Sequence, residues 1–355
     1  MDIRQATADY EKWLTARIPL LAHDLEAKHQ AMAADRFQFF RATFYRWVQR
    51  WPAVCPELAQ APPLLSVGDL HVENFGTWRD AEGRLIWGVN DFDETYPMAY
   101  TNDLVRLAAS AEMAIEIHDL SLSADDACDA IVEGYAQGLE QGGGPFVLSE
   151  CHHRLRGMAI ERLKDPNKFW DKLQGFAPAA DLPKPVAELL ASRLPEPGLK
   201  HRVVSRIAGL GSLGRRRFVA LADWRGGLVA REAKELTVSA CLFCKPVPAG
   251  EPIRYPAILA AAVRTPDPFV ELQGNWLLRR LAPDCSRIEL DSLPAERDEV
   301  KLLRSMGFET ANIHLGDPQA IPAVRKDLAG RGPKWLRKAS TAMAEAIQED
   351  WEGWK

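Results

Sequence analysis

The fold and the chemistry of this chain are decided by the stretch Val67-Gly68-Asp69-Leu70-His71-Val72-Glu73-Asn74. A short apolar run, residues 64–67, leads into it and predicts a strand, so the polar residues crowd the loop at the end of that strand. A β-hairpin within residues 76–89 is predicted next, with its turn in the sequence Asp-Ala-Glu-Gly. The acidic sequence Asn-Asp-Phe-Asp-Glu at 90–94 follows the hairpin. We therefore expect the two polar loops to lie side by side.

The residue types in these two loops point to phosphoryl transfer. Asp69 would accept the proton of a substrate hydroxyl, and His71 is a second catalytic candidate in the same loop. Asn74, five residues after Asp69, and Asp91, 17 residues further on, would hold Mg²⁺ on the phosphates, with Asp93 joining the metal shell or positioning its loop. The alternative is that Asp69 and Asn74 cap a turn and that residues 90–94 form a solvated acidic loop.

A glycine-rich string lies between two predicted strands further along the chain. Its sequence is Gly209-Leu210-Gly211-Ser212-Leu213-Gly214, and the chain continues with strands near 218–221 and 228–230 and then Lys234. A dinucleotide-binding fingerprint would open a helix instead. A glycine loop between strands, with a lysine on the third strand, is typical of the hairpin that covers nucleotide phosphates in protein kinases. Gly209, Gly211, Ser212, Gly214 and Lys234 are therefore candidate nucleotide-binding residues, and an ordinary hairpin with a surface lysine is the alternative.

The periodicity of apolar residues divides the rest of the chain into helical and β-rich parts. It predicts two or three helices from 9 to 51, stopped by Pro52 and Pro56, then long helices at 103–118 and 125–140. Alternating patterns between 203 and 281 predict strands, including one at 276–281. Residues 294–355 are predicted to be helical, with a polar break between Gly316 and Pro333.

The composition excludes several classes of protein. The chain has 355 residues, 47% hydrophobic and 26% charged, and a net charge of −5, which disfavours disorder and sequence-independent binding of nucleic acid. No apolar stretch approaches the ~20 residues of a membrane span, and the N-terminus lacks a signal peptide pattern, so we expect a soluble, cytoplasmic protein that does not bind membranes. The six scattered cysteines predict free thiols, and a metal site at Cys241 and Cys244, supplemented by Cys151-His152-His153, is disfavoured.

Taken together, the two polar loops resemble those of known families. The strings Val67–Gly76 and Asn90–Glu94, with residues 34–45, 102–108 and 209–234, resemble the uncharacterised bacterial family catalogued as domain of unknown function 2252, over most of the chain. More distantly, the site motifs alone resemble the aminoglycoside phosphotransferase branch of the protein-kinase-like fold. That resemblance implies Asp69 as catalytic base, Asn74 and Asp91 as metal ligands, Lys234 as phosphate-binding lysine, and Asp103 as a structural carboxylate that supports the catalytic loop.

The order of the motifs departs from that of ordinary kinases, in which the glycine loop and its lysine precede the catalytic loop. The prediction is therefore an α+β, two-lobed, protein-kinase-like fold with permuted motif order. Residues 1–200 would form the first part of the helical lobe with the catalytic and metal loops, 201–288 the β-rich nucleotide-binding lobe, and 289–355 a helical segment that returns to the large lobe. The glutamate that pairs with the lysine in kinases is not placed, and Glu251, 17 residues after Lys234, is no more than a candidate.

The leading functional prediction is an ATP- and Mg²⁺-dependent phosphotransferase that acts on a hydroxyl of a small molecule, whose identity the sequence does not indicate. Its partners would be a nucleotide and that acceptor. Three alternatives remain open: a kinase-like protein that binds nucleotide without phosphotransfer and acts as a regulator, an AMP transferase, and a metal-dependent hydrolase built on Asp69, His71, Asp91 and Asp93. The oligomeric state is not predicted.

Overall fold

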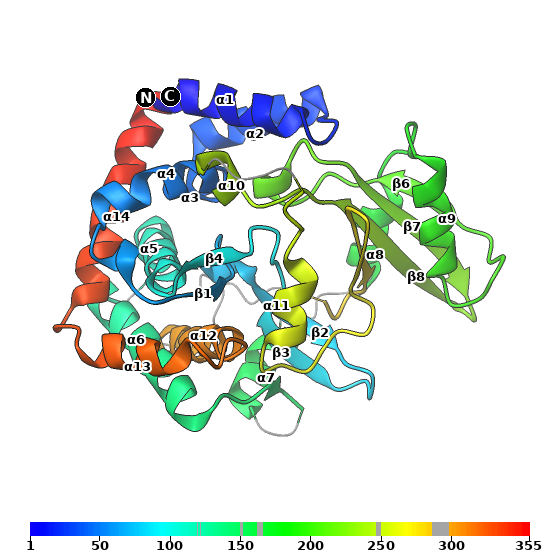
Figure 1. Ribbon diagram of the computed structural model, residues 1–355. Coiled ribbons are helices and arrows are strands. Elements are labelled where there is room, and N and C mark those ends of the chain that lie inside the picture. The colour runs from blue at the N-terminus through cyan, green and yellow to red at the C-terminus, as the bar shows by residue number, and fades with distance from the viewer. Residues whose placement is uncertain (119, 121, 150–151, 162–165, 246–249, 286–297) are drawn as a thin grey trace.

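The computed structural model describes residues 1–118, 120, 122–149, 152–161, 166–245, 250–285 and 298–355. Helices make up one side of the molecule, and a five-stranded sheet with two helices forms the other (Figure 1). The two termini lie side by side, and the side chain of Arg4 donates a hydrogen bond to the carbonyl of Trp354. The chain therefore has the mixed α and β composition that the sequence predicts.

Four helices, rather than two or three, form the N-terminal region: α1 (Ile3–Thr15), α2 (Ala22–Ala34), α3 (Arg36–Ala42) and α4 (Phe44–Val54). The carboxylate of Asp35 accepts a hydrogen bond of 2.7 Å from the backbone N–H of Gln38, which begins α3 as a helix separate from α2. Pro52 does not stop α4 but lies inside it, and the helix ends two residues later. Proline has no N–H to donate to the carbonyl of Val48, so it removes one helical hydrogen bond in this last turn.

The strands predicted around the polar loops are present. β1 (Pro63–Ser66) pairs with β4 (Tyr96–Ala99), and β2 (Phe75–Arg79) pairs with β3 (Leu85–Val89), which also pairs with the short β5 (Phe146–Val147). The loop that contains Asp69 follows β1, and residues 90–94 follow β3. The long helices α5 (Thr101–His118) and α6 (Ala124–Gln141) come next, close to the predicted ranges.

An antiparallel sheet has the strand order β6-β7-β8-β10-β9. Its strands are β6 (Arg202–Ser205), β7 (Arg217–Trp224), β8 (Gly227–Glu235), β9 (Glu271–Gln273) and β10 (Trp276–Leu281). Helix α9 (Lys184–Ser192) packs on the face that points away from the helical part, and α8 (Pro166–Gln174) packs on part of the opposite face. Both helices precede residue 200, so the sheet is covered by residues that the predicted boundary assigns to the helical lobe.

The C-terminal helices pack on the helical part. They are α12 (Asp298–His314), α13 (Ile321–Ala329) and α14 (Trp335–Trp354), and α13 lies where the sequence predicts a polar break. Glycines permit the close packing of α12 on α6: a Cβ atom at Gly134 would lie 1.9 Å from the carbonyl oxygen of Arg304, and one at Gly307 would lie 2.1 Å from that of Ile131.

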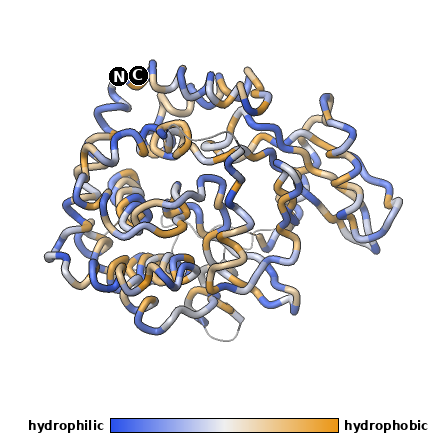
Figure 2. The backbone as a smooth tube through the Cα atoms, in the orientation of Figure 1, coloured by the Kyte–Doolittle hydropathy of each residue, from blue (hydrophilic) through white to orange (hydrophobic). Residues whose placement is uncertain are grey.

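Three shorter helices complete the described structure: α7 (His153–Glu161), α10 (Cys241–Cys244) and α11 (Tyr255–Ala261). Figure 2 shows apolar and polar residues alternating along the helical part, as expected of helices that bury one side. None of the helices in the described ranges is long and apolar enough to cross a membrane.

Candidate functional site

The loop after β1 is fixed to the start of α5. The carboxylate of Asp103 accepts hydrogen bonds from the backbone N–H groups of Val67 (2.8 Å) and Gly68 (3.0 Å), and the side chain of Asn102 donates to the carbonyl of Gly68 (3.1 Å). Gly68 has φ +86°, and a Cβ atom there would lie 2.3 Å from the carbonyl oxygen of Glu94, so glycine is required. Asp103 thus makes the supporting contacts that the family resemblance implies.

Asp103 is itself supported from the far end of the chain. His314 Nε2 lies 3.1 Å from its carboxylate, and the hydroxyl of Tyr135 lies 2.8 Å from His314 Nδ1. All three side chains are buried. Helices α5, α6 and α12 therefore meet beneath the loop that carries Asp69.

Asp69 is held by a buried arginine. Arg106 donates from both Nε (2.7 Å) and Nη2 to Oδ1 of Asp69, and its guanidinium lies 4.0 Å from the ring centroid of Phe40. Burial raises the pKa of Asp69 to about 6, although Arg106 opposes this by stabilising the charged form. The other oxygen, Oδ2, lies on the side of the glycine loop, 3.8 Å from the position of a Cβ atom on Gly211. One oxygen of the carboxylate is thus fixed, while the other faces the loop where a substrate would bind.

His71 and Asn74 stabilise their own loop. The backbone N–H of His71 donates to Oδ1 of Asn74 (2.7 Å), and the backbone N–H of Glu73 donates to Nδ1 of His71 (3.2 Å). These bonds cap the short 3₁₀ turn Val72–Asn74. The capping interpretation is therefore correct for Asn74, although its amide oxygen retains a second lone pair.

Lys234, on β8, reaches the acidic loop. Its Nζ lies 3.3 and 3.4 Å from the two carboxylate oxygens of Asp91 and forms an ion pair with Asp93. Burial opposes the ionisation of Asp91, but Lys234 and nearby arginines outweigh it and hold its pKa below the usual range. Burial and the charge of Asp91 raise the pKa of Asp93. Residues 143 positions apart thus form one partly buried ionic cluster.

The glycine string forms a tight loop over Asp69. A Cβ atom on Gly211 would lie 3.0 Å from the carbonyl oxygen of Arg41, so only glycine allows this approach without displacing α3. Gly209 has φ +75°, and Ser212 donates to its carbonyl (3.2 Å) and accepts from Arg217. The hydroxyl of Ser212 is therefore occupied within the loop.

Gly214, also predicted to bind nucleotide, packs against α2. It has φ +93°, a Cβ atom there would lie 2.9 Å from the side chain of Leu25, and its carbonyl accepts from Leu21 (2.9 Å). Its glycine is required by the turn and by packing on α2. A sequence string of this kind does not indicate which of its glycines turn toward a ligand.

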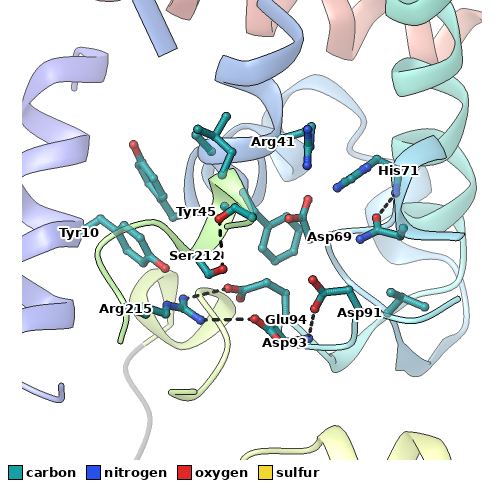
Figure 3. Close-up of a pocket in the computed structure, with 17 residues that line it drawn as sticks. Tyr10, Arg41, Tyr45, Asp69, His71, Asp91, Asp93, Glu94, Ser212 and Arg215 are labelled. Carbon is teal, nitrogen blue, oxygen red and sulfur yellow. Dashed lines mark hydrogen bonds and ion pairs between the residues drawn. The ribbon is translucent and has the colours of Figure 1, made fainter. Parts of the chain in front are cut away.

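The three loops line one cavity of about 50 Å³ (Figure 3). Its lining joins the predicted residues Asp69, His71, Asn74, Asp91, Asp93, Gly209, Gly211 and Ser212 to Tyr10, Arg41, Ala42, Phe44, Tyr45, Val67, Glu94, Leu210 and Arg215. The structure thus brings the two polar loops and the glycine loop together, as expected, with the glycine loop closed over the space between them.

Sequence reasoning missed the cations of this site. Arg215 points at Asp93 and Glu94, at 3.8 and 3.5 Å, and Glu94 also accepts from the backbone N–H of Ala240 (2.6 Å). A buried carboxylate partner of Arg106 could have been predicted, because a charged residue inside an otherwise apolar helix needs such a partner. The run Arg215-Arg216-Arg217 beside the glycine loop favoured a solvated or phosphate-facing role and did not indicate the carboxylate partners of Arg215, which come from another part of the chain.

Other predicted contacts are absent or changed. Glu251 forms an ion pair with Arg254 (2.9 Å) rather than with Lys234, whose partners are aspartates. Cys241 and Cys244 contact Met98 and a backbone carbonyl, and Cys151 lies outside the described residues. Within the described ranges, no group of three or more His, Cys, Asp or Glu side chains is arranged to hold a metal ion.

Comparison with known families agrees with the resemblance seen in the loops. Residues 20–167 match DUF2252. The family is described as "Uncharacterized protein conserved in bacteria (DUF2252)". The DUF2252 match includes Asp69, His71, Asn74, Asp91 and Asp93 but not the glycine loop or Lys234. Searches of curated proteins and of solved structures returned no match.

Proposed function

We propose that this protein is a kinase-like phosphotransferase that uses ATP and Mg²⁺ and acts on a hydroxyl of a small molecule. The contact of Lys234 with Asp91 and Asp93 carries this proposal, because it joins a third-strand lysine to the acidic loop beside Asp69. In protein kinases a lysine on the third strand and a metal-binding aspartate serve the same phosphates. A buried ammonium is costly unless it is paired, and Asp91 and Asp93 supply the pairing that keeps Lys234 charged beside Asp69.

Two further observations support a kinase-like fold with permuted motif order. The glycine loop connects the first two strands of a meander, and the lysine lies near the end of the third, as in kinases. The termini are adjacent, through α1 and the end of α14, and circular permutation requires close termini.

In this mechanism, Asp69 orients the acceptor hydroxyl and takes its proton through Oδ2, while Arg106 keeps Oδ1 fixed. The acceptor oxygen forms a bond to the γ-phosphorus, and the bond between that phosphorus and the bridging oxygen breaks, which releases ADP. A pKa of about 6 leaves Asp69 mostly ionised at neutral pH and still basic enough to accept a proton. Backbone N–H groups of the glycine loop would bind the phosphates.

The donor set fits Mg²⁺ held jointly by protein and phosphates. Asp93 Oδ1 is buried without a hydrogen-bond partner among the described residues, and Asp91 is the more exposed of the two carboxylates. Mg²⁺ is commonly bound through one or two carboxylates plus substrate phosphates, so a three-residue cluster is not needed. Bound there, it would neutralise the developing phosphate charge, and Lys234 would exchange its carboxylate partners for phosphate oxygens.

A second candidate function is nucleotide binding without transfer. Asn74 uses its side-chain oxygen to cap its own loop, and Lys234 has no glutamate partner in the described part of the chain. Both features would suit a regulator that senses nucleotide. Catalysis by Asp69 distinguishes the two functions.

The test follows the fate of ATP labelled at the α- or the γ-phosphate, with Mg²⁺ and a panel of hydroxyl compounds. The proposal predicts transfer of the γ-label alone, and the variant Asp69→Asn should lose at least a thousandfold in turnover while it still binds ATP. Asp223→Asn, an exposed carboxylate at the end of β7, is the matched control. Transfer of the α-label would establish AMP transfer instead, and ATP binding with no transfer to any compound would establish the regulator.

A further inference from the structure

A second, larger cavity adjoins the acidic loop that carries Asp91. It has a volume of about 730 Å³, within the range of small-molecule sites, and it shares Asp91 and Gly209 with the cavity above Asp69. Its walls come from strands β7, β9 and β10 of the sheet, from α11, and from Trp78 on β2. It therefore adjoins the proposed site.

The walls of this cavity carry a surplus of positive charge. Three carboxylates line it, those of Asp91, Asp267 and Glu271. The cations in its lining are Lys172, Arg206, Arg217, Arg264, Arg279 and Arg280.

Part of this charge is organised by one fully buried carboxylate. Glu232 forms ion pairs with Arg206 and Arg279, and its Oε1 lies 3.8 Å from Nη1 of Arg217. A single carboxylate cannot neutralise three guanidinium groups. The arginines hold the pKa of Glu232 below its usual range even though burial opposes its ionisation, so the cluster stays charged.

Several guanidinium nitrogens at this cavity are buried without a hydrogen-bond partner among the described residues. They are Nε of Arg217, Nε and Nη1 of Arg264, and Nε and Nη2 of Arg280. Arg264 lies over the rings of Trp78 (4.5 Å) and Phe92 (5.1 Å), which hold its plane but accept no strong hydrogen bond. A buried donor without a partner is costly, so these guanidinium groups would be stabilised by an anion toward which they could turn.

Apolar side chains form the rest of the wall, among them Leu259 on α11 and Leu277 on β10. They lower the local dielectric and strengthen the attraction of the arginines for an anion. Arginine suits phosphate because its planar fork binds two oxygens at once.

We propose that this cavity binds a phosphate chain, with Arg217, Arg264 and Arg280 as donors. A chain of linked phosphates matches several guanidinium groups spread along one cavity, whereas a single carboxylate would satisfy only one. The phosphate chain could belong to the nucleotide itself, entering past Asp91 and Gly209, or to a second phosphorylated ligand. The site does not depend on phosphoryl transfer, and it therefore goes beyond the proposed function.

The experiment is isothermal titration of the full chain with sodium tripolyphosphate, without Mg²⁺ or acceptor. We expect saturable binding that is weakened about tenfold or more in Arg264→Gln and in Arg280→Gln. Arg264→Lys should retain part of the affinity. Arg216→Gln is the matched control, because Arg216 pairs with Glu235 and packs on Trp276 outside the cavity, and it should bind within twofold of the wild type. Thermal unfolding of each variant identifies any that do not fold, and the two arginines test the site independently.

Competition with ATP identifies which ligand supplies the phosphate chain. If ATP displaces tripolyphosphate, the phosphate chain belongs to the nucleotide. If both bind at once, the phosphate chain belongs to a second ligand. Absence of saturable binding, or equal affinity in wild type and both glutamine variants, overturns the proposal. Tripolyphosphate binding by a protein that never transfers phosphate would refute only the proposed function, and transfer without tripolyphosphate binding would refute only this inference.

Discussion

The two faces of the five-stranded sheet differ in composition although they come from the same strands. The face covered by α9 is apolar and includes Phe218, Ala233 and Leu278. The face toward the helical part carries Glu232 and Lys234, which flank Ala233 along β8. Successive residues of a strand point to opposite sides, so one strand can serve both packing and a charged site.

The comparison indicates how stability and function are divided in this molecule. Apolar residues on the α9 side are stabilised by removal from water, which needs no particular partner. Charges on the inward face are costly to bury and persist only in the pairs that the helical part and the neighbouring strands provide. Substitutions of the apolar residues on the α9 side should therefore change stability without changing ligand binding, and those of the charged residues on the inward face should affect the site.

Lys234→Met is the strongest test of the inward face. Removal of the ammonium leaves Asp91 and Asp93 without their shared cation and removes the proposed phosphate ligand. We expect ATP-dependent turnover to fall about a thousandfold, which corresponds to about 4 kcal/mol. Arg216→Gln, which changes a cation paired outside the cavity, should keep turnover within twofold. Normal turnover in Lys234→Met would remove the lysine from the site.

Glu232→Gln tests whether the inward face also contributes to stability. Loss of this buried carboxylate should lower the free energy of unfolding by about 3 kcal/mol at pH 7, because it leaves three arginines unneutralised. The folded pKa of Glu232 lies below its unfolded value of about 4.3, so its contribution is present above that pH and is lost as the pH falls through the folded pKa. Denaturant unfolding should show a larger difference from wild type at pH 7 than at pH 4, and a difference that grows on acidification would contradict this.

Leu278→Ala tests the α9 side. Leu278 is 2% exposed and packs in the cluster with α9, so its truncation should lower the free energy of unfolding by about 2–3 kcal/mol. Denaturant unfolding measures this effect. Affinity for ATP should remain within twofold, and a large loss of affinity in the folded variant would show that the two faces are not independent.

A smaller effect on turnover is expected from the protonation of Asp69 at low pH. With a pKa raised to about 6 by burial, Asp69 is protonated as the pH falls, and a protonated carboxyl cannot accept the hydroxyl proton. Turnover per KM at pH 5 should be about tenfold below its neutral plateau, or about 1.4 kcal/mol. A plateau that extends below pH 5 would mean that another group acts as the base.

Local patterns predicted much of the fold around the site. The helices at 103–118 and 125–140, the hairpin before residues 90–94, and the strand 276–281 follow from periodicity and turn residues, which act over short stretches of chain. Local patterns did not indicate the features that depend on contacts between distant parts of the chain. Gly214 turns toward α2, α13 occupies the predicted polar break, and α8 and α9 cover the sheet.

The sequence by itself determined which loops of this protein carry carboxylates, which loop carries glycines, and that Lys234 lies on the strand after the next turn. These features are local, since they depend on residue types and spacings within single segments. Only the tertiary structure decided that Lys234 meets Asp91, that Arg106 holds Asp69, and that arginines from three segments, Arg217, Arg264 and Arg280, surround one cavity. Each of these contacts joins residues more than 15 positions apart. Packing of the folded chain brings these residues together, and their spacing along the sequence does not predict the contacts.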